Sequence, residues 1–247
     1  MYIVSKFIDY YDDALKKLPC PRNYERGNNN DLSKKEQFSI LNHFGANCPK
    51  NGLVKNVASD IMKNAMQKGP LGALVSLTKE VVVYLTENGA NATGKKKMLA
   101  DDALREYPNN YCSELLVSED KSSLGKSLKY VRIGPVAICY WVTNKTNNND
   151  VWASNYNDVG FDGISSFDYD IATPADFDLI EPQASIMFPL YSVDLILIDQ
   201  KLYAVSFDPA PKLKGTPIEL LNPDVKMAEY IQKAVQMMDK SLYRITA

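Results

Sequence analysis

Asp194 is the residue whose surroundings most clearly suggest chemistry, because its carboxylate lies inside the apolar run 193–198. A carboxylate in such a strand is costly unless it is paired, hydrogen-bonded or bound to a metal. Ser206 and Asp208 follow on the next extended run, and residues two positions apart on a strand share one face. We therefore expect these side chains to face one site. A structural role for Asp194, and a turn begun by Asp208 before Pro209, stay open as alternatives.

The overall composition excludes several classes of site. The chain has 247 residues and a net charge of −2, so no whole-chain field would attract nucleic acid or an anionic membrane. The one histidine, His43, makes a poly-His metal site or a His-based general base a poor expectation. The four cysteines include no Cys-x-x-Cys pair, which disfavours a structural zinc site.

No segment of the sequence reads as an export signal or a membrane span. The N-terminus lacks a basic region followed by an apolar stretch of the length that a secretory signal needs. The most apolar stretch, 69–85, is interrupted by Lys79 and Glu80 and is too short and too charged to span a bilayer. We expect a cytoplasmic protein with reduced thiols and with neither a membrane nor a nucleic-acid partner.

Hydrophobic spacing and turn residues predict the helices and strands that must position Asp194, Ser206 and Asp208. In the first half the predicted elements are a surface loop at 20–34, a helix at 53–68, a strand at 81–85, a loop at 88–97, a helix at 99–107 and an extended segment at 111–117. In the second half they are a hairpin at 129–143, two strands at 193–199 and 202–207 joined by a tight turn, and a helix from Asn222 to about 238.

The strongest motif lies in the second predicted hairpin and the residues after it. Segment 193–196 reads V-D-L-I, and after a tight turn segment 203–216 reads Y-A-V-S-F-D-P-A-P-K-L-K-G-T. This resembles the C-terminal motif of ATP-grasp carboxylate–amine ligases, in particular short phage-encoded ones. Their pattern is V-D-(I/L)-(I/L), a tight turn, and Y-V-(L/I)-(E/D)-(V/F)-N-x-A-P-G-L-x-G-T-x-x-E. The match extends through Glu219 and shares the turn length and the A-P-x-L-x-G-T tail.

Weaker likenesses to the same family follow upstream in the expected order. They are 42–54, similar to the N-terminal lobe; 81–98, where the family has a strand and a Gly-rich phosphate loop; 111–116, similar to the hinge strand that contacts adenine; 130–133, similar to its Y-R-V strand; and 155–161, similar to its R-N-x-x-x-G-W segment. Their collinearity supports the resemblance.

The resemblance implies an α+β fold of the ATP-grasp type, with two α+β lobes around a nucleotide cleft and antiparallel sheets. It implies an N-terminal extension and lobe at 1–68, a central lobe at 69–120 and a C-terminal lobe at 121–247. It also implies ATP and magnesium as cofactors. In this family a carboxylate and ATP give an acyl phosphate, from which an amine displaces phosphate.

Particular site residues are implied by the same resemblance. The assigned roles are catalysis for Arg132 and Asp194, nucleotide binding for Lys68, Lys95 and Glu114, and magnesium binding for Asp194, Ser206 and Asp208. Ordinary structural roles stay open beside these: Lys68 suits the C-terminal dipole of its helix, 95–97 reads as a solvated run, and Arg132 fits a solvent-facing strand position.

This sequence departs from the family pattern at several charged positions. Ser206 stands at the position of the family's bridging acidic ligand, and Asp208 stands where the family usually has Asn. Tyr84 stands near the position of the phosphate-binding Lys or Arg, and Ser154 stands where the family has Arg. Two functions therefore stay open. One is an ATP- and magnesium-dependent ligase of weak activity on a small-molecule or peptide carboxylate. The other is a non-catalytic ATP-grasp pseudoenzyme that binds a protein partner as a phage accessory or host-interaction protein.

Overall fold

The computed structural model describes part of the chain: residues 2–4, 25–27, 32–72, 78–86, 94–116, 126–133, 136–144, 167–172, 190–199 and 201–208, with the single residues 229 and 233. Several sequence expectations lie outside these residues. They are the substitution at Ser154, segment 155–161, the A-P-x-L-x-G-T tail, and the helix from Asn222, of which only Glu229 and Lys233 are described, both helical and exposed.

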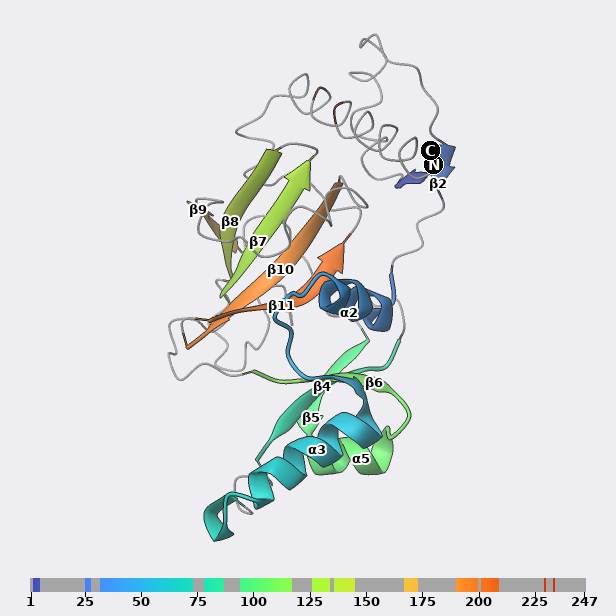
Figure 1. Cartoon of the computed structure of the whole chain (residues 1–247), viewed down its shortest axis with the longest axis vertical. Helices are drawn as coiled ribbons and strands as arrows, with labels where there is room; N and C mark the ends of the chain where they lie inside the picture. Colours follow the sequence, from blue (N-terminus) through green and yellow to red (C-terminus); the bar gives the residue numbers. More distant parts are fainter. Residues whose placement is uncertain are drawn as a thin grey trace.

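A five-stranded antiparallel sheet forms the larger part of the described fold (Figure 1). Its strand order is β11–β10–β7–β8–β9. The strands are β7 (Lys126–Ile133), β8 (Val136–Asn144), β9 (Phe167–Ala172), β10 (Leu190–Ile198) and β11 (Lys201–Asp208). Both predicted hairpins are confirmed, since β7 pairs with β8 and β10 pairs with β11.

The turn between β10 and β11 is short because one residue adopts a left-handed conformation. Asp199 has φ of 47°, and Ile198 pairs with Lys201 directly across the turn. Two-residue hairpin turns that match the strand twist need positive φ, which Asp tolerates better than most residues. This turn fixes the register of the hairpin, and with it the face on which each side chain lies.

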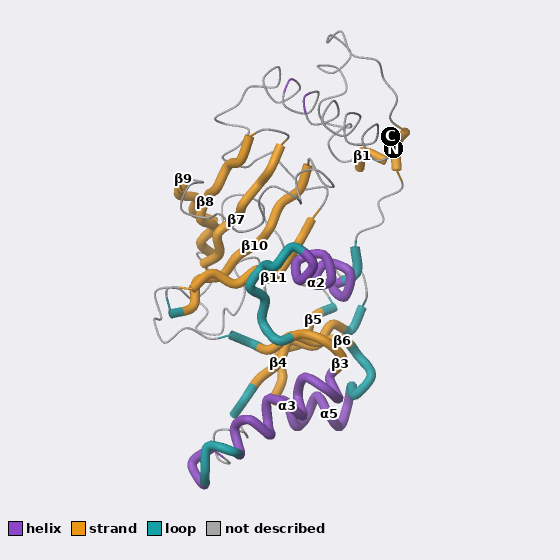
Figure 2. Tube along the Cα trace, viewed as in Figure 1, coloured by secondary structure: helices purple, strands orange, loops and turns teal. Residues whose placement is uncertain are grey.

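A second, four-stranded sheet has the order β3–β6–β4–β5 and carries two helices (Figure 2). Its elements are β3 (Asn51–Leu53), α3 (Val54–Met66), β4 (Glu80–Tyr84), β5 (Lys95–Leu99), α5 (Ala100–Glu106) and β6 (Tyr111–Glu114). The helices predicted at 53–68 and 99–107 are thus confirmed. Their apolar faces pack with β4 and β6 in a core that includes Val57, Ile61 and Val83.

The loop predicted at 88–97 is wrong at its end, where residues 95–97 belong to β5. Three consecutive lysines disfavour a strand locally, but β4 supplies the partner: Val83 pairs with Lys96 and Tyr84 with Lys95. Long-range backbone hydrogen bonds therefore override local propensity. Lys96 is exposed, whereas Lys95 is partly buried, so the lysine run is not simply a solvated one.

The loop predicted at 20–34 is also wrong at two places. Glu25–Gly27 forms β2, which pairs in parallel with β1 (Tyr2–Val4), and Lys34 begins helix α2 (Lys34–His43). Ser33 caps this helix in a capping box: its hydroxyl accepts from the Glu36 backbone, and the Glu36 carboxylate accepts from the Ser33 backbone. The S-x-x-E spacing is the sequence signal for this start.

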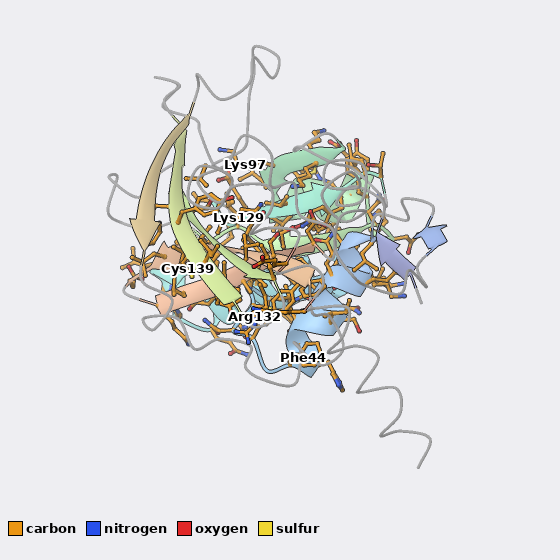
Figure 3. All side chains as sticks on the ribbon, turned by 90° about the horizontal axis from the view of Figure 1, so that it is seen from above. Phe44, Lys97, Lys129, Arg132 and Cys139 are labelled. Carbon is orange, nitrogen blue, oxygen red and sulfur yellow. The ribbon has the colours of Figure 1, made fainter. Side chains whose placement is uncertain are left out.

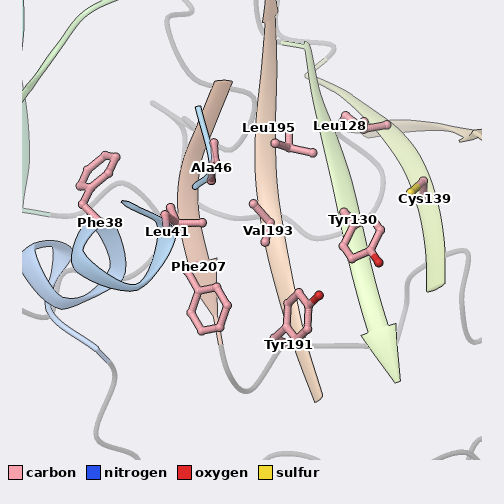
Figure 4. Close-up of a cluster of buried hydrophobic side chains, with 11 residues drawn as sticks. Phe38, Leu41, Ala46, Leu128, Tyr130, Cys139, Tyr191, Val193, Leu195 and Phe207 are labelled. Atoms are coloured by element: carbon pink, nitrogen blue, oxygen red, sulfur yellow. The ribbon is translucent and has the colours of Figure 1, made fainter. Parts of the chain in front are cut away.

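A single apolar cluster joins α2 to one face of the five-stranded sheet (Figure 4). Its buried members are Phe38, Leu41, Ala46, Leu128, Tyr130, Cys139, Tyr191, Val193, Leu195, Ala204 and Phe207. Tyr84 and Tyr111, from the four-stranded sheet, pack against the same cluster. Helix α2 therefore lies between the two sheets and contacts both (Figure 1). No helix among the described residues is both long and apolar enough to cross a membrane.

Removing the ring of Phe38 should destabilise the protein strongly, because this side chain is 1% exposed and anchors α2. We expect Phe38→Ala to lower the free energy of unfolding by about 3–5 kcal/mol in urea denaturation. Ser39→Ala, at the exposed next position, is the matched control and should change it by less than about 0.5 kcal/mol. Equal effects of the two substitutions would contradict the packing described for α2.

Candidate functional site

Three polar side chains form a row across β7, β10 and β11. The strand registers place Lys129 opposite Asp194, and Asp194 opposite Ser206. Directly opposed residues of antiparallel strands share one face of the sheet. Lys129 Nζ lies 2.9 Å from Asp194 Oδ1, and the two side chains are 24% and 28% exposed. The carboxylate that was expected to need a partner is therefore paired with a lysine of the neighbouring strand.

Asp208 extends this row, since it lies two residues after Ser206 and pairs with Ser192. The common face predicted for Asp194, Ser206 and Asp208 is confirmed by the register. A β-bulge follows, because Leu195 pairs with Ala204 and leaves Val205 as the extra residue. The bulge lets Ala204 turn into the apolar core, while Ser206 stays on the same face as Lys129 and Asp194. We call this face of the five-stranded sheet the charged face.

Lys34, the first residue of α2, reaches this charged face with its ammonium group. Its Nζ donates to Gln37 Oε1 at 2.7 Å, to Ser206 Oγ at 2.9 Å and to the Val205 carbonyl at 3.2 Å. These three acceptors match the three N–H donors of an ammonium group. Lys34 is only 9% exposed. The helix and β11 together therefore hold this cation in a fixed position.

Sequence reasoning did not single out Lys34. A cation in the first turn of a helix is disfavoured by the helix dipole, so its position has no explanation within α2 alone. The available signal was the pair Ser33 and Glu36, which marks a helix start and places a lysine directly inside it. Its contact with Ser206 joins residues 172 positions apart, which no local pattern indicates.

The pKa of Lys34 shows how the charges surround it. Burial lowers this pKa from 10.5 to about 7, and the charge of Lys95 acts in the same direction. The carboxylates of Asp194 and Asp208 oppose that lowering, and the charge of Lys129 adds to it. Lys34 therefore senses charged groups from β5, β7, β10 and β11 at once.

Asp194 is the centre of this arrangement. Burial alone would raise the pKa of Asp194, but the charge and hydrogen bond of Lys129, with the charges of Lys34 and Lys95, hold it below its usual value. For Lys129 the burial effect is outweighed by Asp194, which raises the pKa of the lysine. Burial lowers the pKa of Lys95 on β5, and Asp194 partly offsets this. We call Lys34, Lys95, Lys129, Asp194 and Asp208 the lysine–aspartate cluster.

The structure does not bring every predicted site residue into this cluster. Arg132 lies three residues after Lys129 on β7 and pairs with Tyr191, so it falls on the opposite, core-facing side of the sheet (Figure 3). Lys68 is exposed just beyond α3, at the end of that helix that points away from the five-stranded sheet (Figure 1). Glu114 ends β6, where its backbone N–H donates to the Lys50 carbonyl at 2.8 Å.

Tyr84 stands near the position where the resemblance implies a phosphate-binding cation. Its hydroxyl lies 2.9 Å from Ser113 Oγ, and burial raises the pKa of this phenol, so it stays neutral. Its ring lies 6.3 Å from that of Tyr111, which lies 6.3 Å from Phe38. Tyr84 is therefore part of an aromatic row that leads from the four-stranded sheet to α2, and it carries no charge for a phosphate.

The cluster does not suit the two-magnesium ligand set that the resemblance implies. Within the described ranges no group of three or more His, Cys, Asp and Glu side chains is placed to hold a metal ion. One oxygen of Asp194 is bound by Lys129. The Ser206 hydroxyl accepts from Lys34 and donates to Gln37 Oε1 at 3.1 Å. The positive charge at this face comes from lysines instead.

Solved structures with a similar fold are ATP-grasp ligases. One is a Chryseobacterium gregarium RiPP-associated ATP-grasp ligase in complex with ADP and a leader and core peptide, with a TM-score of 0.50, 14% identity, and coverage of 84% of this chain and 60% of that one. Another is the ATP-grasp ligase PsnB with a phosphomimetic variant of a minimal precursor, Mg and ADP, with a TM-score of 0.50, 10% identity, and coverage of 84% and 59%.

These likenesses establish the fold. The chain has an ATP-grasp-like α+β fold with two antiparallel sheets, as the sequence predicted. It spans about three-fifths of the length of the two ligases named. No protein-family model matches the sequence, and no curated protein matches it.

The buried ammonium of Lys34 should make stability depend on pH. Between pH 7 and 10.5 the unfolded chain keeps this lysine protonated while the folded protein releases the proton. Stability of the wild type should therefore rise with pH relative to Lys34→Met, by at most about 1.4 kcal/mol per pH unit. Urea denaturation of both proteins at pH 7, 8 and 9 measures this. A stability difference that is constant over the window would contradict the burial of Lys34.

Proposed function

We propose that this protein binds ATP at the lysine–aspartate cluster and acts as an ATP-dependent carboxylate–amine ligase. The observation that carries the proposal is the convergence of three lysines, from α2, β5 and β7, around Asp194. Two of these elements belong to the five-stranded sheet or pack on it, and β5 belongs to the other sheet. In addition, the two ligases of similar fold named above were solved with ADP.

The chemistry of such a ligase explains why cations must gather. A carboxylate oxygen of the substrate bonds to the γ-phosphorus of ATP as ADP leaves, and an amine then attacks the acyl carbon and displaces phosphate. Both reactants of the first step are anions, so fixed positive charge must lower their repulsion. Lys95 and Lys129, on the two sheets, are suited to bind phosphate oxygens. Lys34, at the start of α2, adds a third positive charge.

Magnesium would add Lewis-acid charge in this family. Asp194 and Asp208 are the described carboxylates on the charged face, and Ser206 shares that face. Since Lys129 binds Asp194 and Lys34 binds Ser206, this set does not fit two metal ions. We therefore assign phosphate binding to the lysines.

The substrate class is proposed from chemistry and from the two similar structures. The first of these ligases was solved with a leader and core peptide, and the second with a variant of a minimal precursor. We propose a peptide or small-molecule carboxylate as the acceptor of phosphate, with an amine as the second substrate. Phage origin and cytoplasmic location rest on the sequence alone and stay predictions.

A second candidate function is a non-catalytic protein that keeps the fold and binds a protein partner. Two observations favour it. Tyr84, which is neutral, stands near the place of a phosphate-binding cation, and Ser206 replaces an acidic ligand and is engaged by Lys34 and Gln37. A protein with this function would bind a nucleotide without turning it over.

Nucleotide binding should depend on Lys95. We expect Lys95→Met to weaken binding of a non-hydrolysable ATP analogue by at least about tenfold, which is about 1.4 kcal/mol. Lys96→Met is the matched control, because the adjacent Lys96 is exposed and interacts with Glu106. Isothermal titration calorimetry of the three proteins measures the effect. If both substitutions weaken binding equally, β5 does not present Lys95 to the nucleotide.

Turnover separates the two candidate functions. Release of ADP from ATP would be measured with a panel of peptide carboxylates and amines, and with Asp194→Asn as the inactive reference. The ligase proposal predicts slow ADP release that requires both substrates and is lost in the variant. ATP binding with no substrate-dependent ADP release from the wild type would favour the non-catalytic function.

A further inference from the structure

We propose that the ammonium groups of Lys34, Lys95 and Lys129 replace divalent metal charge in this site, so that it binds a nucleoside triphosphate free of magnesium. This inference rests on the proposed ATP binding and specifies the form in which the nucleotide binds. It follows from the contacts of Ser206, from the charge balance of the cluster and from the anchoring of Lys34.

Ser206, which the resemblance implies as a metal ligand, is already engaged by a lysine and by an amide oxygen. Its single hydroxyl proton is donated to Gln37 Oε1 at 3.1 Å, and its oxygen accepts from Lys34 Nζ at 2.9 Å. A metal at the remaining lone pair of this oxygen would lie beside the Lys34 ammonium group and would be repelled by it. The site therefore already holds a cation at Ser206, and that cation is part of the chain.

The charge balance of the cluster favours an anion over a further cation. Below pH 7, where Lys34 is protonated, three ammonium groups stand against the two carboxylates of Asp194 and Asp208. Asp194 already has an ammonium nitrogen 2.9 Å from one oxygen. A divalent cation at Asp194 would meet the repulsion of Lys34, Lys95 and Lys129, whereas a polyphosphate would be attracted by all three.

Lys34 is anchored in a way that suits a fixed charge. Its three acceptors come from two elements: Gln37 belongs to α2, while Ser206 and the Val205 carbonyl belong to β11. Gln37 is itself held by a hydrogen bond from its Nε2 to the Leu32 carbonyl at 2.8 Å. A charge held by such a network needs little reorganisation when an anion arrives, which is also the advantage of a bound metal ion.

The test is titration of a non-hydrolysable ATP analogue into the full chain at pH 6, where Lys34 is protonated because its pKa is about 7, once with magnesium and once with EDTA. We expect the wild-type dissociation constant to differ by less than about threefold between the two conditions. Lys34→Met should weaken binding in EDTA by at least about tenfold. Lys35→Met is the matched control, because Lys35 is the exposed next residue of α2, and it should bind as the wild type does.

Each outcome decides the inference. Wild-type binding that is lost in EDTA overturns it and leaves the proposed function standing. Equal binding of the wild type and Lys34→Met in EDTA also overturns it. The absence of nucleotide binding by the wild type in both conditions overturns the inference and the proposed function together. Melting temperatures of all variants establish that they are folded.

A second variant tests the same point by adding a carboxylate. Ser206→Glu places an anion beside Lys34, so it should neutralise that ammonium and create a third carboxylate on the charged face. We expect it to bind the ATP analogue at least about tenfold more weakly in EDTA than with magnesium, unlike the wild type. A Ser206→Glu protein that binds equally well in both conditions would count against the inference.

Discussion

The balance of partly buried charges around Asp194 is the constraint on which the rest of this structure depends. Unpaired charges at such depth are costly. Each ammonium group therefore needs an opposite charge or hydrogen-bond acceptors, and each carboxylate needs an opposite charge or hydrogen-bond donors. The partners come from α2, β5, β7, β10 and β11, which means that neither sheet could complete the arrangement alone. We propose that the same charges give the site an affinity for an anion.

Helix α2 links this charge balance to the hydrophobic core. One side of the helix places Phe38 and Leu41 in the apolar cluster of the five-stranded sheet. Its first residue, Lys34, reaches Ser206 on the charged face. Through Tyr111 the ring of Phe38 also contacts the aromatic row of the other sheet. Because apolar packing sets the position of α2, the ammonium group of Lys34 is placed by the fold and needs no ligand to order it.

Much of the fold was predictable because its signals are local. The hairpin around Asp199 follows from a short turn between alternating runs, and the helix predicted at 53–68 follows from apolar spacing. Asp194 was predictable as a site residue because a carboxylate in an apolar strand demands a partner. Its partner, Lys129, was not, because the pairing of β7 with β10 joins distant segments. Arg132 was predicted as a catalytic residue from the family resemblance. It lies three positions from Lys129 on β7, however, and alternation along the strand puts it on the opposite face of the sheet.

The central claim is that the lysine–aspartate cluster binds the phosphates of a nucleotide, and a crystal structure with a non-hydrolysable ATP analogue tests it most directly. The account predicts phosphate oxygens about 2.7–3.2 Å from the Nζ atoms of Lys95 and Lys129, with Lys34 still bound to Ser206. A nucleotide whose phosphates lie away from these lysines, or one that displaces Lys34 from Ser206 to seat a metal ion there, would contradict it.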